Sequence, residues 1–178
     1  PEGLSIVPNG KFGKGLSAEG GALRFETGGS HYEGWFRIEA YPDQTQCLFA
    51  VGDDRARLLL HPDGRLEILR EKQHGAPYTY PSTPFEATES QIQSIFKKDA
   101  KVVSPNPIPT GEWVHICMLN REHPTPGGGS PWEPTLCING VEVASYLSER
   151  YNSWYWWAHR SSQFTIGNSA KGDQPFTG

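Results

Sequence analysis

Residues 135–145, TLCINGVEVAS, carry the strongest indication of the fold in the chain. Asn139-Gly140 separates two short runs of mostly apolar and β-branched residues. This dipeptide is typical of a two-residue type I′ turn, because both of its positions accept a positive φ. Pairing across the turn places Leu136, Ile138, Val141 and Val143 on one face, and Cys137 and Glu142 on the other. The stretch therefore predicts an antiparallel hairpin that covers an apolar core.

Neighbouring segments show the same period of two. Residues 112–120, EWVHICMLN, predict a strand with one apolar face. That face carries Val114, Ile116 and Met118, and the opposite face carries Trp113, His115, Cys117 and Leu119. Residues 46–51, 56–61 and 65–70 predict a three-stranded meander whose second turn is Pro62-Asp63-Gly64, and residues 163–167 predict a further strand.

The composition agrees with a single all-β domain. The 178 residues include 20 Gly and 15 Pro, which favour turns over helices, and 36% hydrophobic residues supply a core. Lys and Arg number 16 against 20 Asp and Glu, so the net charge is −4, and the chain has no basic run, which argues against a nucleic-acid partner. No apolar run approaches the ~20 residues of a membrane span. We predict a two-sheet antiparallel sandwich.

Two insertions interrupt this pattern, at about residues 71–109 and 146–162. The first carries the chain's only helical pattern, a short helix at residues 88–98 that begins with a capping box of Thr88 and Gln91. The three cysteines are too few and too widely spaced for a disulfide scaffold or a CxxC metal site. We expect Cys117 and Cys137 to be neighbours on adjacent strands, and none of the three thiols to form a structural disulfide bridge.

The order of several short motifs resembles the laminin-G-like, concanavalin-A-like jelly-roll modules, particularly those of bacterial secreted and cell-surface proteins. The matching stretches span nearly the whole chain. They are residues 10–16 with 22–25, 33–38, 48–52 with 57–66, 108–116, 136–144, and 164–168 with 175–178. The resemblance implies one jelly-roll domain over residues 1–178, in a protein that is secreted, periplasmic or on the cell surface.

The two ends of the chain depart from the family pattern. Such modules open with a strand before the Gly-Lys-Phe-Gly segment and close with another after the final Gly, and here both look shortened or absent. Missing strands would leave backbone groups and apolar core exposed. We therefore expect that the natural polypeptide continues beyond both ends, or that another chain or residues 4–7 fill the gap.

Catalytic motifs are not evident in the sequence. Some jelly-roll relatives are glycosidases with two carboxylates two residues apart on one strand face, but no two of the 20 acidic residues have that spacing. The segment at residues 10–15 is glycine-rich but has no following helix, so it is interpreted as a structural turn rather than a phosphate site. We predict that the domain is not an enzyme.

The family resemblance also implies one bound Ca²⁺ at the rim of the sandwich. Calcium takes oxygen ligands, and the oxygen-rich loops available for it contain Asp53 with Asp54, and Asn168 with Asp173. Asp and Asn are also common turn residues, and at each of these positions a turn residue is the favoured interpretation over a calcium ligand.

The most unusual stretch is residues 151–160, YNSWYWWAHR, with five aromatic rings in its first seven residues. Trp and Tyr stack on the C–H faces of sugars, so rings left outside the core would form a glycan platform. The predicted platform residues are Tyr151, Asn152, Trp154, Tyr155, Trp156, Trp157, His159 and Arg160, joined by Tyr78 and Tyr80. Packing of some of these rings over a sheet is the competing interpretation.

The sequence thus favours a non-catalytic, lectin-like module that binds glycan. A structural or interaction module that contacts flanking protein domains is the second hypothesis. A hydrolase or lyase without a recognisable catalytic motif is the third.

Overall fold

The computed structural model describes residues 3–19, 21–27, 31–52, 56–70, 101–122, 132–145 and 162–177, and in these ranges the regular structure is entirely β. The strands are β1 (Leu4–Gly10), β2 (Gly13–Ala18), β3 (Leu23–Thr27), β4 (His31–Arg37), β5 (Gln46–Val51), β6 (Ala56–Leu60), β7 (Leu66–Arg70), β8 (Lys101–Val103), β9 (Trp113–Glu122), β10 (Trp132–Ile138), β11 (Val141–Ser145) and β12 (Ser162–Ile166). In this described part, no helix is long and apolar enough to cross a membrane.

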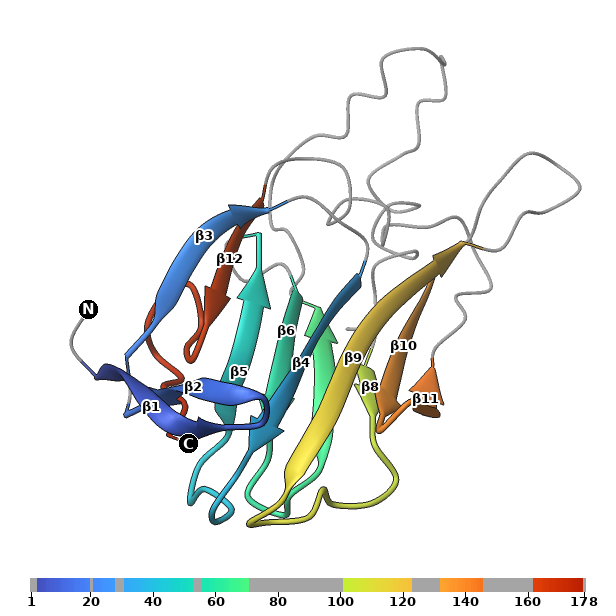
Figure 1. Ribbon diagram of the computed structural model, residues 1–178. Coiled ribbons are helices and arrows are strands. Elements are labelled where there is room, and N and C mark those ends of the chain that lie inside the picture. Colours follow the sequence, from blue (N-terminus) through green and yellow to red (C-terminus); the bar gives the residue numbers. More distant parts are fainter. Residues whose placement is uncertain are drawn as a thin grey trace, which may run out of the picture.

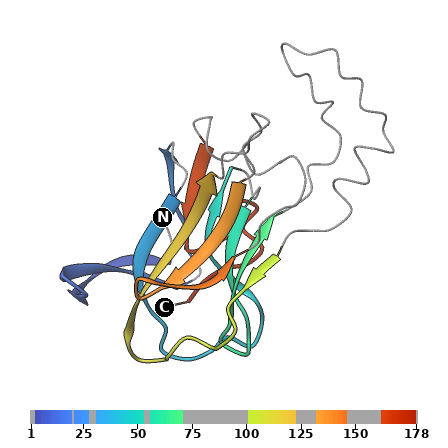
Figure 2. The same cartoon turned by 90° about the vertical axis from the view of Figure 1, so that its right-hand side faces the viewer.

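The strands form two facing antiparallel sheets and a separate hairpin. One sheet has four strands in the order β11-β10-β9-β4, and the other has six in the order β3-β12-β5-β6-β7-β8. The two sheets lie against each other as the layers of a sandwich (Figure 1). The β1–β2 hairpin forms its own two-stranded sheet and projects from one side of the sandwich (Figure 2). The predicted two-sheet antiparallel sandwich is confirmed.

The core lies between the two sheets and follows the predicted alternation. Val114, Ile116 and Met118 on β9 are at most 1% exposed. They pack with Leu58, Leu60 and Ile68 of the six-stranded sheet in one cluster of buried residues. Burying a Leu or Ile side chain contributes about 1.5–3 kcal/mol, so this cluster dominates the stability of the fold.

The two predicted tight turns are both present. Asn139 has φ 51° and Gly140 φ 79°, as a type I′ turn requires, and Gly64 has φ 79° after Pro62-Asp63. The face prediction for the first hairpin was wrong at Val141, which is 63% exposed. The register between β10 and β11 shifts after Leu136: Leu136 pairs with Ala144, but Cys137 pairs with Glu142. Val141 lies beside the turn on β11, the end strand of the four-stranded sheet.

Three regions differ from the sequence expectation. Residues 101–109, predicted as part of an insertion, contain β8, and Val102 and Ile108 belong to the core. Ser162, placed at the end of the second insertion, begins β12. The opening strand expected to be shortened or absent is present as β1, seven residues long. The helix predicted at residues 88–98 lies outside the described residues.

Candidate functional site

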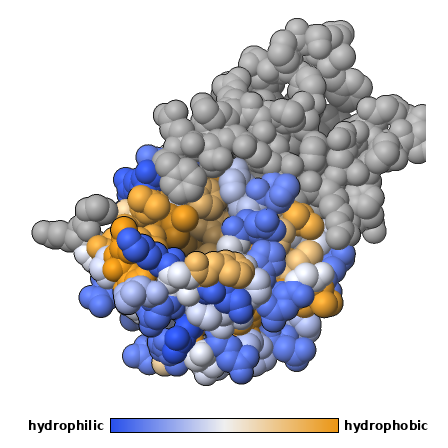
Figure 3. Space-filling model, in the orientation of Figure 1, coloured by the Kyte–Doolittle hydropathy of each residue, from blue (hydrophilic) through white to orange (hydrophobic). Residues whose placement is uncertain are grey.

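A cleft of about 520 Å³ opens beside the β1–β2 hairpin. Its walls are β2 on one side and β4 on the other, and we call it the β2–β4 cleft. The hairpin forms its own two-stranded sheet instead of continuing the four-stranded sheet beyond β4 (Figure 1). Figure 3 shows this place as a hollow lined with hydrophobic residues.

The floor of the cleft is the apolar inner face of the six-stranded sheet. It includes Phe49 of β5 and Phe164 of β12, together with Phe176 from the segment after β12, and all three are at most 6% exposed. The rings of Phe49 and Phe164 lie 5.4 Å apart, and Tyr32 of β4 stacks on Phe164 at 4.8 Å. Desolvation by burial raises the pKa of the Tyr32 phenol. Aromatic side chains at the edge of the hydrophobic core therefore form the floor of the cleft.

The outer rim carries a second group of aromatic and charged side chains, which we call the Trp35 cluster. Its members are Lys11, Phe12, Glu33, Trp35 and His115. Phe12 is at the tip of the hairpin, and Glu33 and Trp35 alternate with the inward Tyr32 and Phe36 along β4. Three separate segments thus bring these side chains together.

The geometry of the cluster centres on the indole of Trp35. The ring of Phe12 meets it edge to face with centroids 5.9 Å apart, and the ring of His115 is 5.1 Å away. The Lys11 ammonium lies 4.6 Å from the indole centroid, within cation–π range. Glu33 Oε2 lies 3.5 Å from His115 Nε2. Trp35 is 38% exposed and Phe12 81% exposed, so solvent reaches both rings.

The hairpin turn of β10–β11 fixes His115 in position. The Asn139 side chain accepts a hydrogen bond from the His115 backbone N–H at 2.9 Å, and the Asn139 N–H donates to the His115 carbonyl at 2.8 Å. Because β4 pairs with β9, Trp35 lies directly across from His115. The rim is therefore held by the sheet itself.

Such a surface offers the contacts that a polar ligand with an apolar face requires. Exposed aromatic rings supply contact area, while Lys11, Glu33 and His115 supply hydrogen-bond donors and acceptors. The sequence patterns did not predict this cluster. Two signals were available: Phe12 is an apolar residue in a glycine-flanked turn, and Trp35 falls on the polar face of its strand.

The glycan platform predicted from the sequence lies outside the described residues. This holds for Tyr151, Asn152, Trp154, Tyr155, Trp156, Trp157, His159, Arg160, Tyr78 and Tyr80, and for the proposed calcium ligands Asp53 and Asp54. Asn168 and Asp173 are described, and both belong to one turn after β12.

Asn168 and Asp173 each accept hydrogen bonds within that turn through Oδ1. Asn168 Oδ1 accepts from the backbone N–H groups of Ser169 at 2.8 Å and Gln174 at 3.1 Å. Asp173 Oδ1 accepts from the Ser169 hydroxyl at 2.5 Å, and this bond lowers the pKa of the Asp173 carboxyl. Among the residues with described positions, no three His, Cys, Asp or Glu side chains are grouped to hold a metal ion.

The two cysteines expected to be neighbours are directly opposite each other. Cys117 of β9 pairs with Cys137 of β10, on the outer face of the four-stranded sheet; both are buried, as is Cys47, and none of the three is in a disulfide. Burial, with smaller effects of Cys137 and Glu33, raises the pKa of the Cys117 thiol to about 11. The Cys117 thiol is thus held in its protonated, unreactive form at neutral pH.

Alkylation of Cys117 with iodoacetamide should therefore follow an unusually alkaline pH profile. Because the thiolate is the nucleophile, we expect the rate in the folded protein to keep rising up to a midpoint near pH 11. Because the pKa of this thiol is raised in the folded protein, its contribution to the free energy of unfolding is fully present below about pH 9. That contribution is lost as the pH approaches 11. Peptide mass spectrometry after timed labelling measures this, and a midpoint near pH 8.5 would contradict it.

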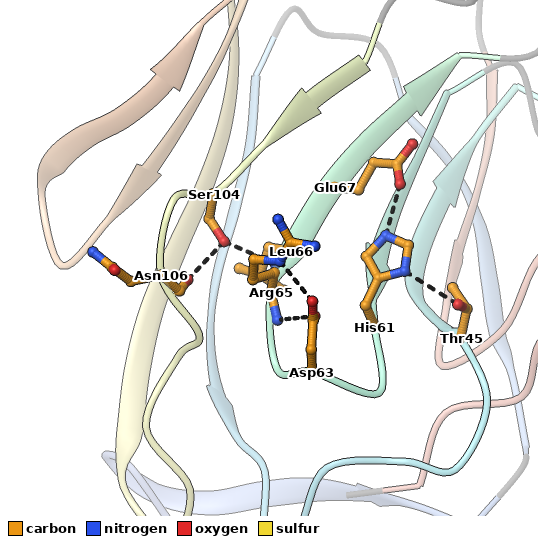
Figure 4. Close-up of polar contacts among 8 residues, drawn as sticks. All are labelled: Thr45, His61, Asp63, Arg65, Leu66, Glu67, Ser104 and Asn106. Atoms are coloured by element: carbon orange, nitrogen blue, oxygen red, sulfur yellow. Dashed lines mark hydrogen bonds and ion pairs between the residues drawn. The ribbon is translucent and has the colours of Figure 1, made fainter.

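A group of polar side-chain contacts at the β6–β7 hairpin has a structural role (Figure 4). His61 Nε2 lies 2.6 Å from Glu67 Oε2, and His61 Nδ1 lies 3.2 Å from Thr45 Oγ1. Next to it, the Ser104 hydroxyl accepts from the Leu66 N–H at 2.9 Å and donates to the Asn106 carbonyl. None of these residues lines the β2–β4 cleft. The Ser104 contacts connect the hairpin to the segment that follows β8, and His61 connects it to Thr45, just before β5.

Fold and site together define a lectin-type jelly roll with a surface aromatic cluster. A laminin-G-type family model, described as the concanavalin A-like lectin/glucanases superfamily, matches residues 13–178. The chain belongs to this superfamily. A sequence search of curated proteins finds no match.

Solved structures with the same fold include carbohydrate-binding modules. The CBM40 of the Ruminococcus gnavus IT-sialidase bound to α2,3-sialyllactose superposes with a TM-score of 0.51 at 12% identity, covering 84% of this chain and 70% of that one. A second structure of the same CBM40 gives the same values. At this identity the likeness shows the fold.

Proposed function

We propose that the domain is a non-catalytic carbohydrate-binding module of a secreted or cell-surface protein, and that the Trp35 cluster contacts the glycan. The observation that carries the proposal is a solvent-exposed pair of aromatic rings, Trp35 and Phe12, bordered by charged side chains on a sheet of lectin type. Membership of the lectin/glucanase superfamily supports it, and so does the sialyllactose bound by the CBM40 of the same fold.

The geometry of the cluster suits a sugar. A pyranose ring has one apolar C–H face, which packs on an aromatic ring, and a rim of hydroxyls. The Lys11 ammonium lies over the indole, and the Glu33 carboxylate lies 3.5 Å from His115 Nε2; in our proposal they offer such hydroxyls a donor and an acceptor. In our proposal the superfamily's sandwich supplies a rigid support, and no bond is made or broken.

Glycan-array binding of the intact chain tests the function, and substitution tests the site. Removing a central interface Trp costs about 2 kcal/mol or more, so Trp35→Ala should weaken retention about 30-fold. Trp35→Phe should lose less, because it keeps a ring for stacking. Val141→Ala, at a 63% exposed position outside the cluster, should bind like the wild type.

The aromatic segment at residues 151–160 is the second place where sugar is expected to bind. Replacing Trp154 and Trp156 together by Ala distinguishes glycan binding by this segment from glycan binding by the Trp35 cluster. If only that double variant loses retention, glycan binding stands and its assignment to Trp35 is wrong. If the wild type binds no glycan on a broad array of neutral and sialylated sugars, the proposed function is wrong.

A further inference from the structure

The β1–β2 hairpin carries large apolar side chains that face water. Ile6 is 74% exposed and Leu16 is 42% exposed, and the two lie directly opposite each other across the hairpin. Residues that are opposite in an antiparallel pair point to the same face, so these two form one apolar patch. Phe12, in the turn between the strands, is 81% exposed. Single exposed apolar residues are normal on a soluble surface, whereas three on one hairpin indicate an interaction site.

The charge of this hairpin is opposite in sign to that of the whole chain. Residues 4–18 contain Lys11 and Lys14 and no Asp or Glu, whereas the chain has a net charge of −4. Both lysines are exposed. Contact between two copies of the hairpin would bring like charges together, so the charges favour an anionic partner over a second copy of this chain.

The hairpin projects from the sandwich and is held at both of its ends (Figure 2). At its base the Glu19 N–H donates to the Gly3 carbonyl at 2.8 Å, and at its tip Phe12 rests against Trp35. A stable protein interface takes about 20–30 residues a side, more than strands of seven and six residues supply. A lipid surface needs no matching shape, because its interfacial layer accepts apolar side chains and cations that project into it.

We propose that the β1–β2 hairpin is a contact site for an anionic lipid surface, with Ile6 and Leu16 entering the interfacial layer. Lys14 pairs with lipid phosphates at the same surface. Binding of a peripheral segment increases with the apolar area that it buries and with the attraction of its cations to anionic headgroups. The Ile6–Leu16 patch supplies the first contribution, and the lysines supply the second. This goes beyond glycan contact, since none of these three residues belongs to the Trp35 cluster.

Sedimentation of the intact chain with lipid vesicles tests the proposal. One kind of vesicle contains phosphatidylcholine alone, and the other contains equal parts of phosphatidylcholine and the anionic phosphatidylglycerol. Neither carries a glycan. The variants are Ile6→Ser and Lys14→Gln. Val141→Ser is the matched control, because Val141 is a β-branched apolar residue at 63% exposure outside the hairpin. Lys11 and Phe12 stay unchanged, because they belong to the Trp35 cluster.

We expect the wild type to bind the anionic vesicles about 30-fold more tightly than the neutral ones, from about 5-fold for each lysine. Ile6→Ser should lower the partition coefficient about 10-fold, and Lys14→Gln about 5-fold. Val141→Ser should bind like the wild type. The proposal is overturned if the anionic vesicles retain no protein, or if Val141→Ser weakens binding as much as Ile6→Ser. It is also overturned if light scattering shows a dimer that Ile6→Ser dissociates, because a second copy then covers the patch.

Two further measurements separate lipid contact from folding and from glycan binding. The urea midpoints of Ile6→Ser and Val141→Ser should match the wild type, since substitutions at exposed positions change stability little. Lys14→Gln removes a charge and no apolar contact, so it tests the proposal independently of packing in the hairpin. Glycan retention by Ile6→Ser should equal that of the wild type. Failure of vesicle binding therefore leaves the proposed function standing.

Discussion

Gly64→Ala should be one of the most destabilising single-methyl additions in this domain, lowering the free energy of unfolding by about 2–5 kcal/mol. Two costs add. Gly64 has φ 79°, and a non-glycine residue in the left-handed region costs about 1–2 kcal/mol. A Cβ there would also lie 2.5 Å from the Tyr41 ring and 2.9 Å from Pro107, and overpacking typically costs 1–3 kcal/mol.

Tyr41 is 38% exposed, but a hydrogen bond restrains its ring. Its hydroxyl donates a 2.7 Å hydrogen bond to the Ile108 carbonyl, and the Ile108 N–H in turn donates to the Gly64 carbonyl at 2.9 Å. The turn, the ring and the segment after β8 are thus locked together. Rotation of the ring away from a new Cβ would break this hydroxyl bond.

Gly140→Ala is the matched control, because it isolates the backbone cost. Gly140 has the same φ of 79°, but a Cβ there would have nothing within 4 Å. We expect it to cost about 1–2 kcal/mol. Urea unfolding of both variants gives the comparison, and equal losses would show that Tyr41 and Pro107 do not restrict the turn.

Ile116→Ala should lower the free energy of unfolding by about 2–5 kcal/mol, the range for truncation of a buried Ile. Ile116 is 0% exposed in the centre of β9 and belongs to the main core cluster. Domains of this kind have about 5–15 kcal/mol of stability in total, so the loss is a large fraction.

Truncation to Ala of a β-branched residue at an exposed position is the comparison. Val141→Ala, at 63% exposure, should change stability by no more than about 0.5 kcal/mol. Denaturant midpoints of the two variants test the layer assignment. A small effect at Ile116 would mean that β9 does not face the six-stranded sheet.

The fold was predictable where local chemistry determines the structure. Asn139-Gly140 and Pro62-Asp63-Gly64 specify turns, and the alternation of Val114, Ile116 and Met118 specifies which side of β9 is buried. β8 was missed because a strand of three residues is too short to show a period of two. Val141 was misplaced because a register shift is a tertiary effect.

The candidate site was harder to predict because it combines distant segments. Phe12, Trp35 and His115 meet only once the hairpin, β4 and β9 are in place. Sequence reasoning instead selected residues 151–160 by their local density of rings, and that prediction stays open. The neighbouring positions of Cys117 and Cys137 were predictable, because they follow from strand register alone.

The most direct measurement is an NMR titration of the intact chain with a glycan retained on the array, following the tryptophan indole N–H signals. We expect the Trp35 indole and the His115 amide to shift with a common dissociation constant, and Trp35→Ala to remove that response. If other signals shift at saturation while the Trp35 and His115 signals stay unchanged, glycan contact at this cluster is contradicted.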